Sequence, residues 1–226
     1  AVNRRGRTTV ENSTGYPQIA MHLTLAAHTL RRVRIRRLLV GLISAATMLV
    51  APPLAGAAPV ASPTLTGLTE AIAGRLALAD TVAATKWASG AAIDDPAREQ
   101  VVLDTVSQLA TDRGLDPAYV RGVFRNQIEA SKTVQRGLFA QWRLPGQTAP
   151  PATSDLGPVR TAINEFTVAI VDQLAAAGEL VTSFRCPPEL ITATGRTAAD
   201  FGFDPLHTGA LIQAGSSVCT VSTGSG

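Results

Sequence analysis

The sequence has few of the side chains that most enzymes use as nucleophiles or general bases. It contains three histidines and two cysteines in 226 residues, and only one histidine, His207, lies beyond residue 28. It also lacks a glycine-rich phosphate-binding loop and a serine set in a strand–turn–helix nucleophile motif. A reaction that depends on a histidine base or on such a nucleophile is therefore nearly excluded.

Charged residues are also scarce, at 16% of the chain, and aromatic residues make up 4% against 46% apolar residues. This composition excludes disorder of the whole chain. The net charge of +3 would suggest nucleic acid as a partner, but eight of the 20 Lys and Arg residues lie before residue 38. From residue 58 onward there are 12 basic and 16 acidic residues. The domain is therefore acidic, and we expect no nucleic-acid partner.

Residues 1–57 are predicted to be an N-terminal extension that ends in a signal peptide. A positive segment, RRVRIRR, precedes an apolar segment of 14 residues and an Ala-Gly-Ala site that ends at Ala57, which are the three parts of a secretory signal. The alternative is a retained membrane anchor, but the apolar run is shorter than the roughly 20 residues that span a bilayer. We expect cleavage after Ala57, a secreted or cell-envelope location, and no stable membrane association afterwards.

The rest of the chain shows helical spacing of apolar residues and no convincing strand. We predict a flexible tail over 58–64 and a single all-α bundle domain over 65–226. The predicted helices span about 66–89, 94–113, 116–142, 158–183, 189–195 and 205–214.

The two cysteines, Cys186 and Cys219, lie near the end of the chain. An even number of cysteines in an exported protein predicts one disulfide, which would tie the two short C-terminal helices together. A metal site is the alternative, but zinc needs three or four ligands and His207 is the one histidine in this part of the chain. We therefore predict the disulfide and no metal.

Three cations occupy unusual positions on the predicted helices. Arg75 and Lys86 are eleven residues apart, which returns to within about 20° of one face of an α-helix, and that face is otherwise small and apolar. Such cations either extend to solvent or meet an anion. Arg160 lies in the first turn of its helix, where the helix dipole disfavours a cation. From spacing alone, extension to solvent is the favoured interpretation for Arg75 and Lys86, whereas the position of Arg160 invites a functional explanation.

Polar residues at helical spacing accompany the cations. Asp95 lies three residues before Arg98 and four before Glu99; this spacing allows Asp95 and Arg98 to pair at the surface, although such pairs are common on helices and carry little information. A polar stripe on the third predicted helix faces solvent or lines a cavity; it consists of Gln127, Ser131 and Gln135. Cations with amides and a hydroxyl suit the binding of a small polyanion, or a reaction that needs only positioning and charge stabilisation.

The ordered set of these motifs resembles a known family, the AroQ-class chorismate mutases, and within it the exported gamma subclass. The motifs are RLALAD with VAATKW (75–87), IDDPARE (93–99), GLDP (114–117) and QIEASKTVQ (127–135). The resemblance covers the whole domain and implies an all-helical bundle with a C-terminal disulfide. It also implies a homodimer that converts chorismate to prephenate by a pericyclic rearrangement, with no cofactor.

The resemblance also implies roles for individual residues. Arg75, Arg98 and Arg160 would bind the two substrate carboxylates, and Lys86 and Gln135 would hydrogen-bond the ether oxygen. The remaining positions would contact the substrate hydroxyl or lie near its ring: Asp95, Glu99 and Ser131. The sequence departs from some exported members at two positions, where Gln135 replaces a glutamate and Val102 replaces a glutamine.

Two other functions fit the same residues. An enzyme of the isochorismate-pyruvate lyase type could use the same bundle and cations to eliminate pyruvate. A non-catalytic exported bundle could use them to bind a small dianion.

Overall fold

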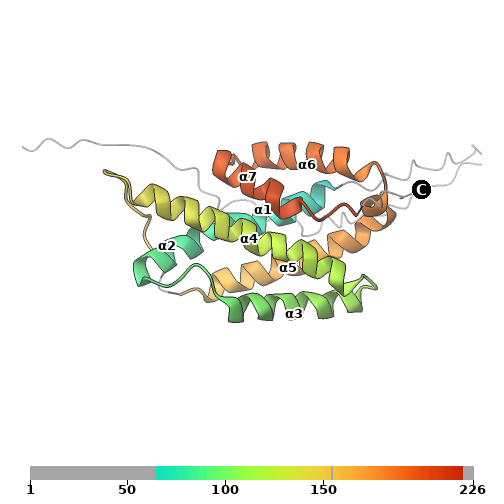
Figure 1. The fold of residues 1–226 in the computed structure, drawn as a ribbon, viewed down its shortest axis with the longest axis horizontal. Helices are drawn as coiled ribbons and strands as arrows, with labels where there is room; N and C mark the ends of the chain where they lie inside the picture. Colours follow the sequence, from blue (N-terminus) through green and yellow to red (C-terminus); the bar gives the residue numbers. More distant parts are fainter. Residues whose placement is uncertain (1–64, 154, 221–226) are drawn as a thin grey trace, which may run out of the picture. The chain divides into compact units, whose positions relative to one another are not determined.

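The computed structural model describes residues 65–153 and 155–220, and every regular element in them is helical (Figure 1). The predicted leader and the tail over 58–64 lie outside the described residues. The elements are α1 (Thr66–Ala77), α2 (Ala79–Ser89), α3 (Pro96–Asp112), α4 (Pro117–Trp142), α5 (Gly157–Ala177), the 3₁₀ helix η1 (Gly178–Thr182), α6 (Cys186–Asp200) and α7 (Pro205–Gly215). The prediction of an all-α fold is confirmed.

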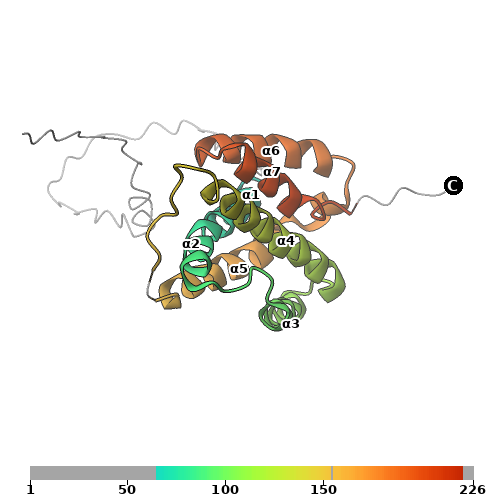
Figure 2. The same cartoon turned by 60° about the vertical axis from the view of Figure 1, so that its left-hand side comes forward.

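The helices pack around a core that α1 and α4 share. α1 packs against α5, α6 and α7, and α4 packs against α2, α3 and α7. Both views place α3 on the side of the bundle opposite α6 and α7, with α4 and α5 between them (Figures 1 and 2). Fully buried apolar side chains such as Ile72, Phe124 and Ile170 fill the space between these helices.

Three helices begin at the same local signal, an aspartate followed by a proline. The Asp95 carboxylate accepts from the backbone N–H of Arg98 at 3.1 Å, and Asp116 accepts from that of Ala118 at 2.9 Å. Asp204 starts α7 in the same way. Each cap satisfies a free N–H group of the first turn and is worth about 1 kcal/mol. The predicted starts of α3 and α4 are confirmed.

Other predicted boundaries were wrong. The helix predicted over 66–89 is divided at Leu78 into α1 and α2, although no glycine or proline marks the break. The helix predicted over 158–183 ends at Ala177, because Gly178 has a φ of +49°, which favours glycine. α6 begins at Cys186 rather than 189, because prolines are well tolerated in the first helical turn.

The predicted disulfide is present between Cys186 and Cys219, whose Cα atoms are 5.7 Å apart. It joins the start of α6 to the segment that follows α7. A backbone hydrogen bond of 2.8 Å from Thr220 to the Val181 carbonyl lies beside it. Within the described residues, no helix combines the length and the apolar character that crossing a membrane requires.

Candidate active site

One cavity of about 190 Å³ brings together side chains from α1 to α5 and from the α2–α3 connection. α2, the start of α3 and the start of α5 lie at one end of the bundle, on the left in Figure 1. All eight residues predicted for the site line this cavity: Arg75, Lys86, Asp95, Arg98, Glu99, Ser131, Gln135 and Arg160. Residues separated by 85 positions in the sequence therefore share one chemical environment.

Arg75 is the most unusual residue of the cavity because its guanidinium is buried without an anion. The residue is 9% exposed, its Nε has no hydrogen-bond partner, and the guanidinium carbon lies 5.7 Å from the Phe124 ring centroid. It forms no ion pair with the described carboxylates. Burial, and then the charge of Arg98, lowers its pKa to about 10. A buried cation is costly unless an anion meets it, so this position suits an anionic ligand.

Arg98 and Arg160 add two more guanidinium groups on α3 and α5, and both residues are exposed. Neither forms an ion pair with another residue in the described part of the chain. Three helices thus direct an arginine each to the cavity. Guanidinium groups bind carboxylates in bidentate fashion, so the set suits a ligand with two carboxylates.

Lys86 is held in place by the backbone of the α2–α3 connection. Its Nζ donates to the Ile93 carbonyl at 2.7 Å, which leaves two of its three N–H donors. Burial lowers its pKa, while Asp95, Asp94 and Glu99 oppose that shift. The side chain therefore presents a positioned cation to the cavity.

Gln135 carries a buried amide that the protein satisfies only in part. The residue is 4% exposed, its Nε2 donates to the Ser131 hydroxyl at 3.2 Å, and its Oε1 is buried without a partner. Gln127, eight residues or about two turns before Gln135, is different because its amide donates to the Ala214 carbonyl at 3.0 Å. The stripe therefore splits into a core residue, Gln127, and two cavity residues.

The acidic residues have different partners from those expected. Asp95 does not pair with the Arg98 guanidinium but caps α3 through the Arg98 backbone N–H, so the surface pair that their spacing allows does not form. Glu99 accepts from Lys132 Nζ at 3.1 Å. The Asp95 carboxylate is not available to the Arg98 guanidinium, because an aspartate at the N-cap position turns its carboxylate back toward the helix N–H groups.

Lys132 is a cavity residue that the sequence did not reveal. Its ammonium also contacts Asp94 and Glu129. Burial lowers its pKa, but the hydrogen bonds to its three carboxylates outweigh this effect and raise the pKa above its usual range. No local signal marks it, because its cavity partner Glu99 is 33 residues away on α3.

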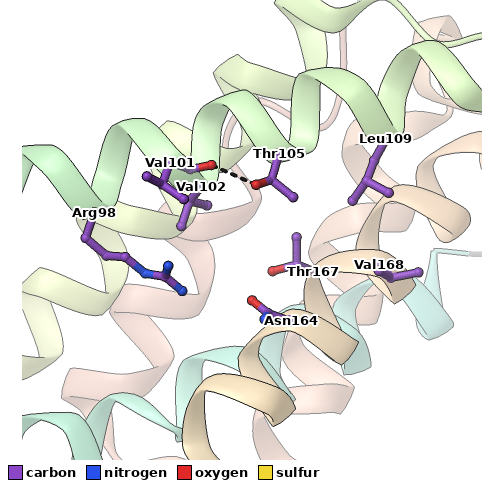
Figure 3. Close-up of a pocket in the computed structure, with 8 residues that line it drawn as sticks. All are labelled: Arg98, Val101, Val102, Thr105, Leu109, Asn164, Thr167 and Val168. Atoms are coloured by element: carbon purple, nitrogen blue, oxygen red, sulfur yellow. Dashed lines mark hydrogen bonds between the residues drawn. The ribbon is translucent and has the colours of Figure 1, made fainter. Parts of the chain in front are cut away.

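A second cavity, of about 260 Å³, lies between α3 and α5 and shares Arg98 and Val102 with the first (Figure 3). Valines, a leucine, two threonines and Asn164 line most of it. Figure 3 shows the Arg98 guanidinium directed from α3 toward Asn164 and Thr167 on α5. Because Lys86 and Gln135 are not among its lining residues and Arg98 is the one charged residue that lines it, the first cavity, which is lined by seven charged residues, is the candidate active site.

Comparison with known proteins points to one family. A family model for chorismate mutase type II matches residues 66–136. A secreted chorismate mutase from Mycolicibacterium smegmatis is 44% identical over 70% of this chain and 87% of its own length. A secreted chorismate mutase from Mycobacterium tuberculosis is 31% identical, over 80% of this chain and 89% of its own length. The crystal structure of chorismate mutase from Burkholderia phymatum has a TM-score of 0.66 at 31% identity, and the match covers 69% of this chain and 95% of that one.

Proposed function

The chain belongs to the chorismate mutase type II family and is an isomerase, and on that premise we propose how its residues convert chorismate to prephenate. The rearrangement breaks a carbon–oxygen bond and forms a carbon–carbon bond within one molecule. It needs no nucleophile and no proton transfer, which agrees with the scarcity of histidine and free cysteine in the sequence. The protein has to supply orientation and charge stabilisation.

The observation that carries this proposal is the buried, unpaired guanidinium of Arg75. Chorismate has two carboxylates, and Arg75, Arg98 and Arg160 bind them in our proposal. The anion replaces the water that the buried Arg75 guanidinium lacks, so the burial of this residue becomes favourable only in the complex. Fixing both carboxylates also holds the reacting ends of the substrate near each other.

Lys86 and Gln135 stabilise the ether oxygen in this proposal. Negative charge develops there as the carbon–oxygen bond breaks, so a fixed cation binds the transition state more strongly than the substrate. The Ile93 carbonyl and the Ser131 hydroxyl hold the two donors before the substrate arrives. Because the donors are already in place, little reorganisation is needed during the reaction.

The ring hydroxyl of chorismate is assigned to the acidic side of the cavity. Glu99 lines the cavity with one oxygen bound to Lys132, which leaves the other free to accept from a hydroxyl. Asp95 holds the start of α3, and so supports the helix that carries Arg98 and Glu99. Ser131 lies near the ring through its contact with Gln135.

We propose the homodimer that the family resemblance implies, in which each protomer has its own site and Arg160 supplies the third arginine. Names of two relatives include the word secreted, which supports export of this chain. On this proposal residues 1–57 are removed after Ala57, and the catalytic domain lies within 65–226.

The test is an assay of the purified exported protein with chorismate. Loss of chorismate is followed by absorbance, and the product is identified by NMR. We expect prephenate in the absence of any added metal or cofactor. Release of pyruvate would identify a lyase instead, and chorismate binding without turnover would identify a non-catalytic dianion-binding protein. Either result would overturn the proposal.

A further inference from the structure

We propose that Lys132 is a positioning residue of this site, acting through Glu99 and Asp94, an inference that rests on the proposed function. Lys132 lies on α4 between Ser131 and Gln135 and lines the same cavity. Its side chain is 11% exposed, and its ammonium contacts Glu129 at 2.6 Å, Glu99 at 3.1 Å and Asp94 at 3.2 Å. These three contacts match its three N–H donors. The ammonium is therefore fully engaged and acts on a ligand through its partners.

The first partner, Glu99, faces the place where a dianion has to bind. A carboxylate there without a counter-charge would repel both substrate carboxylates and weaken their binding. The bond from Lys132 uses Oε1 of Glu99. It offsets part of the negative charge of Glu99 and leaves Oε2 as an acceptor. Lys132 thus allows an acidic residue to serve a dianionic ligand.

The second partner, Asp94, belongs to the connection that holds Lys86. Asp94 receives Lys132 Nζ and also Arg136 Nη2, the latter at 2.7 Å, so two cations of α4 tether it. The preceding residue, Ile93, offers the carbonyl that accepts from Lys86 at 2.7 Å. A displacement of Asp94 would move this carbonyl and with it the Lys86 ammonium. Lys132 therefore helps to fix the donor assigned to the ether oxygen.

The third partner differs from the other two. Glu129 lies on the same helix three residues before Lys132, is exposed, and does not line the cavity. Replacing it removes one ion pair without touching Glu99 or the α2–α3 connection. Glu129→Gln is therefore a matched control for the loss of an ion pair to Lys132.

The experiment measures KM and kcat with chorismate for Lys132→Gln. We expect KM to rise by roughly tenfold because Glu99 is left without a counter-charge. We expect kcat to fall by roughly ten- to a hundredfold because Lys86 is less well placed. Glu129→Gln should stay within about twofold of the parent protein in both constants, as expected for an exposed ion pair.

Two further variants separate positioning from a structural role. In Lys132→Gln with Glu99→Gln, KM should recover toward the parent value, because the uncompensated charge is gone. Lys132→Arg should keep most of kcat, because its guanidinium can still bridge Glu99 and Asp94. No recovery of KM in the double variant, or parent-like constants in Lys132→Gln, would overturn the inference.

The outcome remains informative if Lys132→Gln does not fold, which its thermal melting curve would show. Asp94→Asn then tests the link between Lys132 and Lys86 by changing Asp94, the exposed residue that connects them. This variant should lower kcat while KM changes little. An unchanged kcat in that variant would overturn the link to Lys86. Failure of the proposed function would appear differently, as absence of prephenate formation in the parent protein itself.

Discussion

The imidazole of His207 on α7 lies against the carboxylate of Asp80 at the start of α2, with Nε2 and Oδ1 2.8 Å apart. Its other nitrogen is 2.7 Å from Asp204, so the ring connects two carboxylates. The hydrogen bond to Asp80 is the largest cause that raises its pKa from 6.5 to about 9, burial opposes the shift, and Asp204 adds to it. The contact joins α7 to the helix that carries Lys86.

This contact predicts that stability falls as the pH is raised. The folded pKa is higher than the unfolded one, so the stabilisation is complete below about pH 6.5 and is lost as the pH rises through about 9. Since Asp80 is half exposed, we expect a loss of about 1–2 kcal/mol. The measurement is chemical unfolding at pH 6 and pH 9.5. His207→Asn should be less stable at pH 6 and show a smaller change, and an equal change in both proteins would contradict this account.

Replacing Lys86 tests its proposed contact with the ether oxygen. Lys86→Ala removes the cation from the cavity, and loss of one such donor should lower kcat by roughly 10²- to 10³-fold. The melting temperature should change little, because the side chain is only part-buried and bonds one carbonyl. The check is steady-state kinetics alongside thermal melting. A kcat within about threefold of the parent value would exclude the assigned role.

The sequence predicted those parts of the fold that depend on short-range signals. The Asp-Pro pairs at 95–96 and 116–117 place a capping carboxylate and a residue suited to the first turn side by side, so the helix starts could be located. The break at Leu78 has no such signal, because it arises where α1 and α2 pack against different helices. The two prolines that follow Cys186 are equally typical of a break between helices and of the first turn of a helix.

The same distinction applies to the cavity. Arg75 and Arg160 could be singled out as unusual because a cation on an apolar face, or at a helix start, is locally unfavourable. Lys132 could not, because its partner Glu99 lies 33 residues away and the pair forms only when α3 packs on α4. Gln127 looked equivalent to Ser131 in spacing, and only the position of α7 assigns it to the core.

The disulfide predicts a loss of stability without a loss of activity. The bond between Cys186 and Cys219 closes a loop of 33 residues, so its removal should lower the free energy of unfolding by about 3–4 kcal/mol. None of the residues that line the candidate active site lies on α6 or α7. Replacing both cysteines by serine should therefore leave kcat at 25 °C near the parent value while the denaturation midpoint falls. A parallel loss of kcat in folded protein would show that the disulfide also supports the site.

Because residue 135 is a glutamine, we expect kcat/KM of the parent protein to change little with pH near neutrality. A neutral amide donates at every pH, whereas a glutamate must be protonated to donate a hydrogen bond. Gln135→Glu should therefore lose activity as the pH rises, with a midpoint above the ordinary glutamate pKa because the position is buried. The comparison is kcat/KM from pH 5 to pH 8.5 for both proteins. Identical profiles would mean that this side chain does not donate in the reaction.

We expect the replacement of Arg75 to raise stability and to lower activity. Its guanidinium is buried over Phe124 without an anionic partner in the described residues, so the ligand-free protein bears the cost of dehydrating a charge. Arg75→Met keeps a long side chain and removes that charge, and it should raise the free energy of unfolding by about 1–2 kcal/mol. The same change should lower kcat/KM by roughly a hundredfold or more, because a carboxylate of the substrate loses its buried partner.

The two effects are measured by chemical unfolding and by steady-state kinetics on the same preparation. Arg143→Met is a suitable control, because Arg143 is exposed, lies over Trp87 and is not among the residues lining the candidate active site. It should leave kcat/KM unchanged and should not raise stability. If Arg75→Met is instead strongly destabilised, the guanidinium contributes to the fold, and the unpaired charge could no longer be taken as a sign of an anionic ligand.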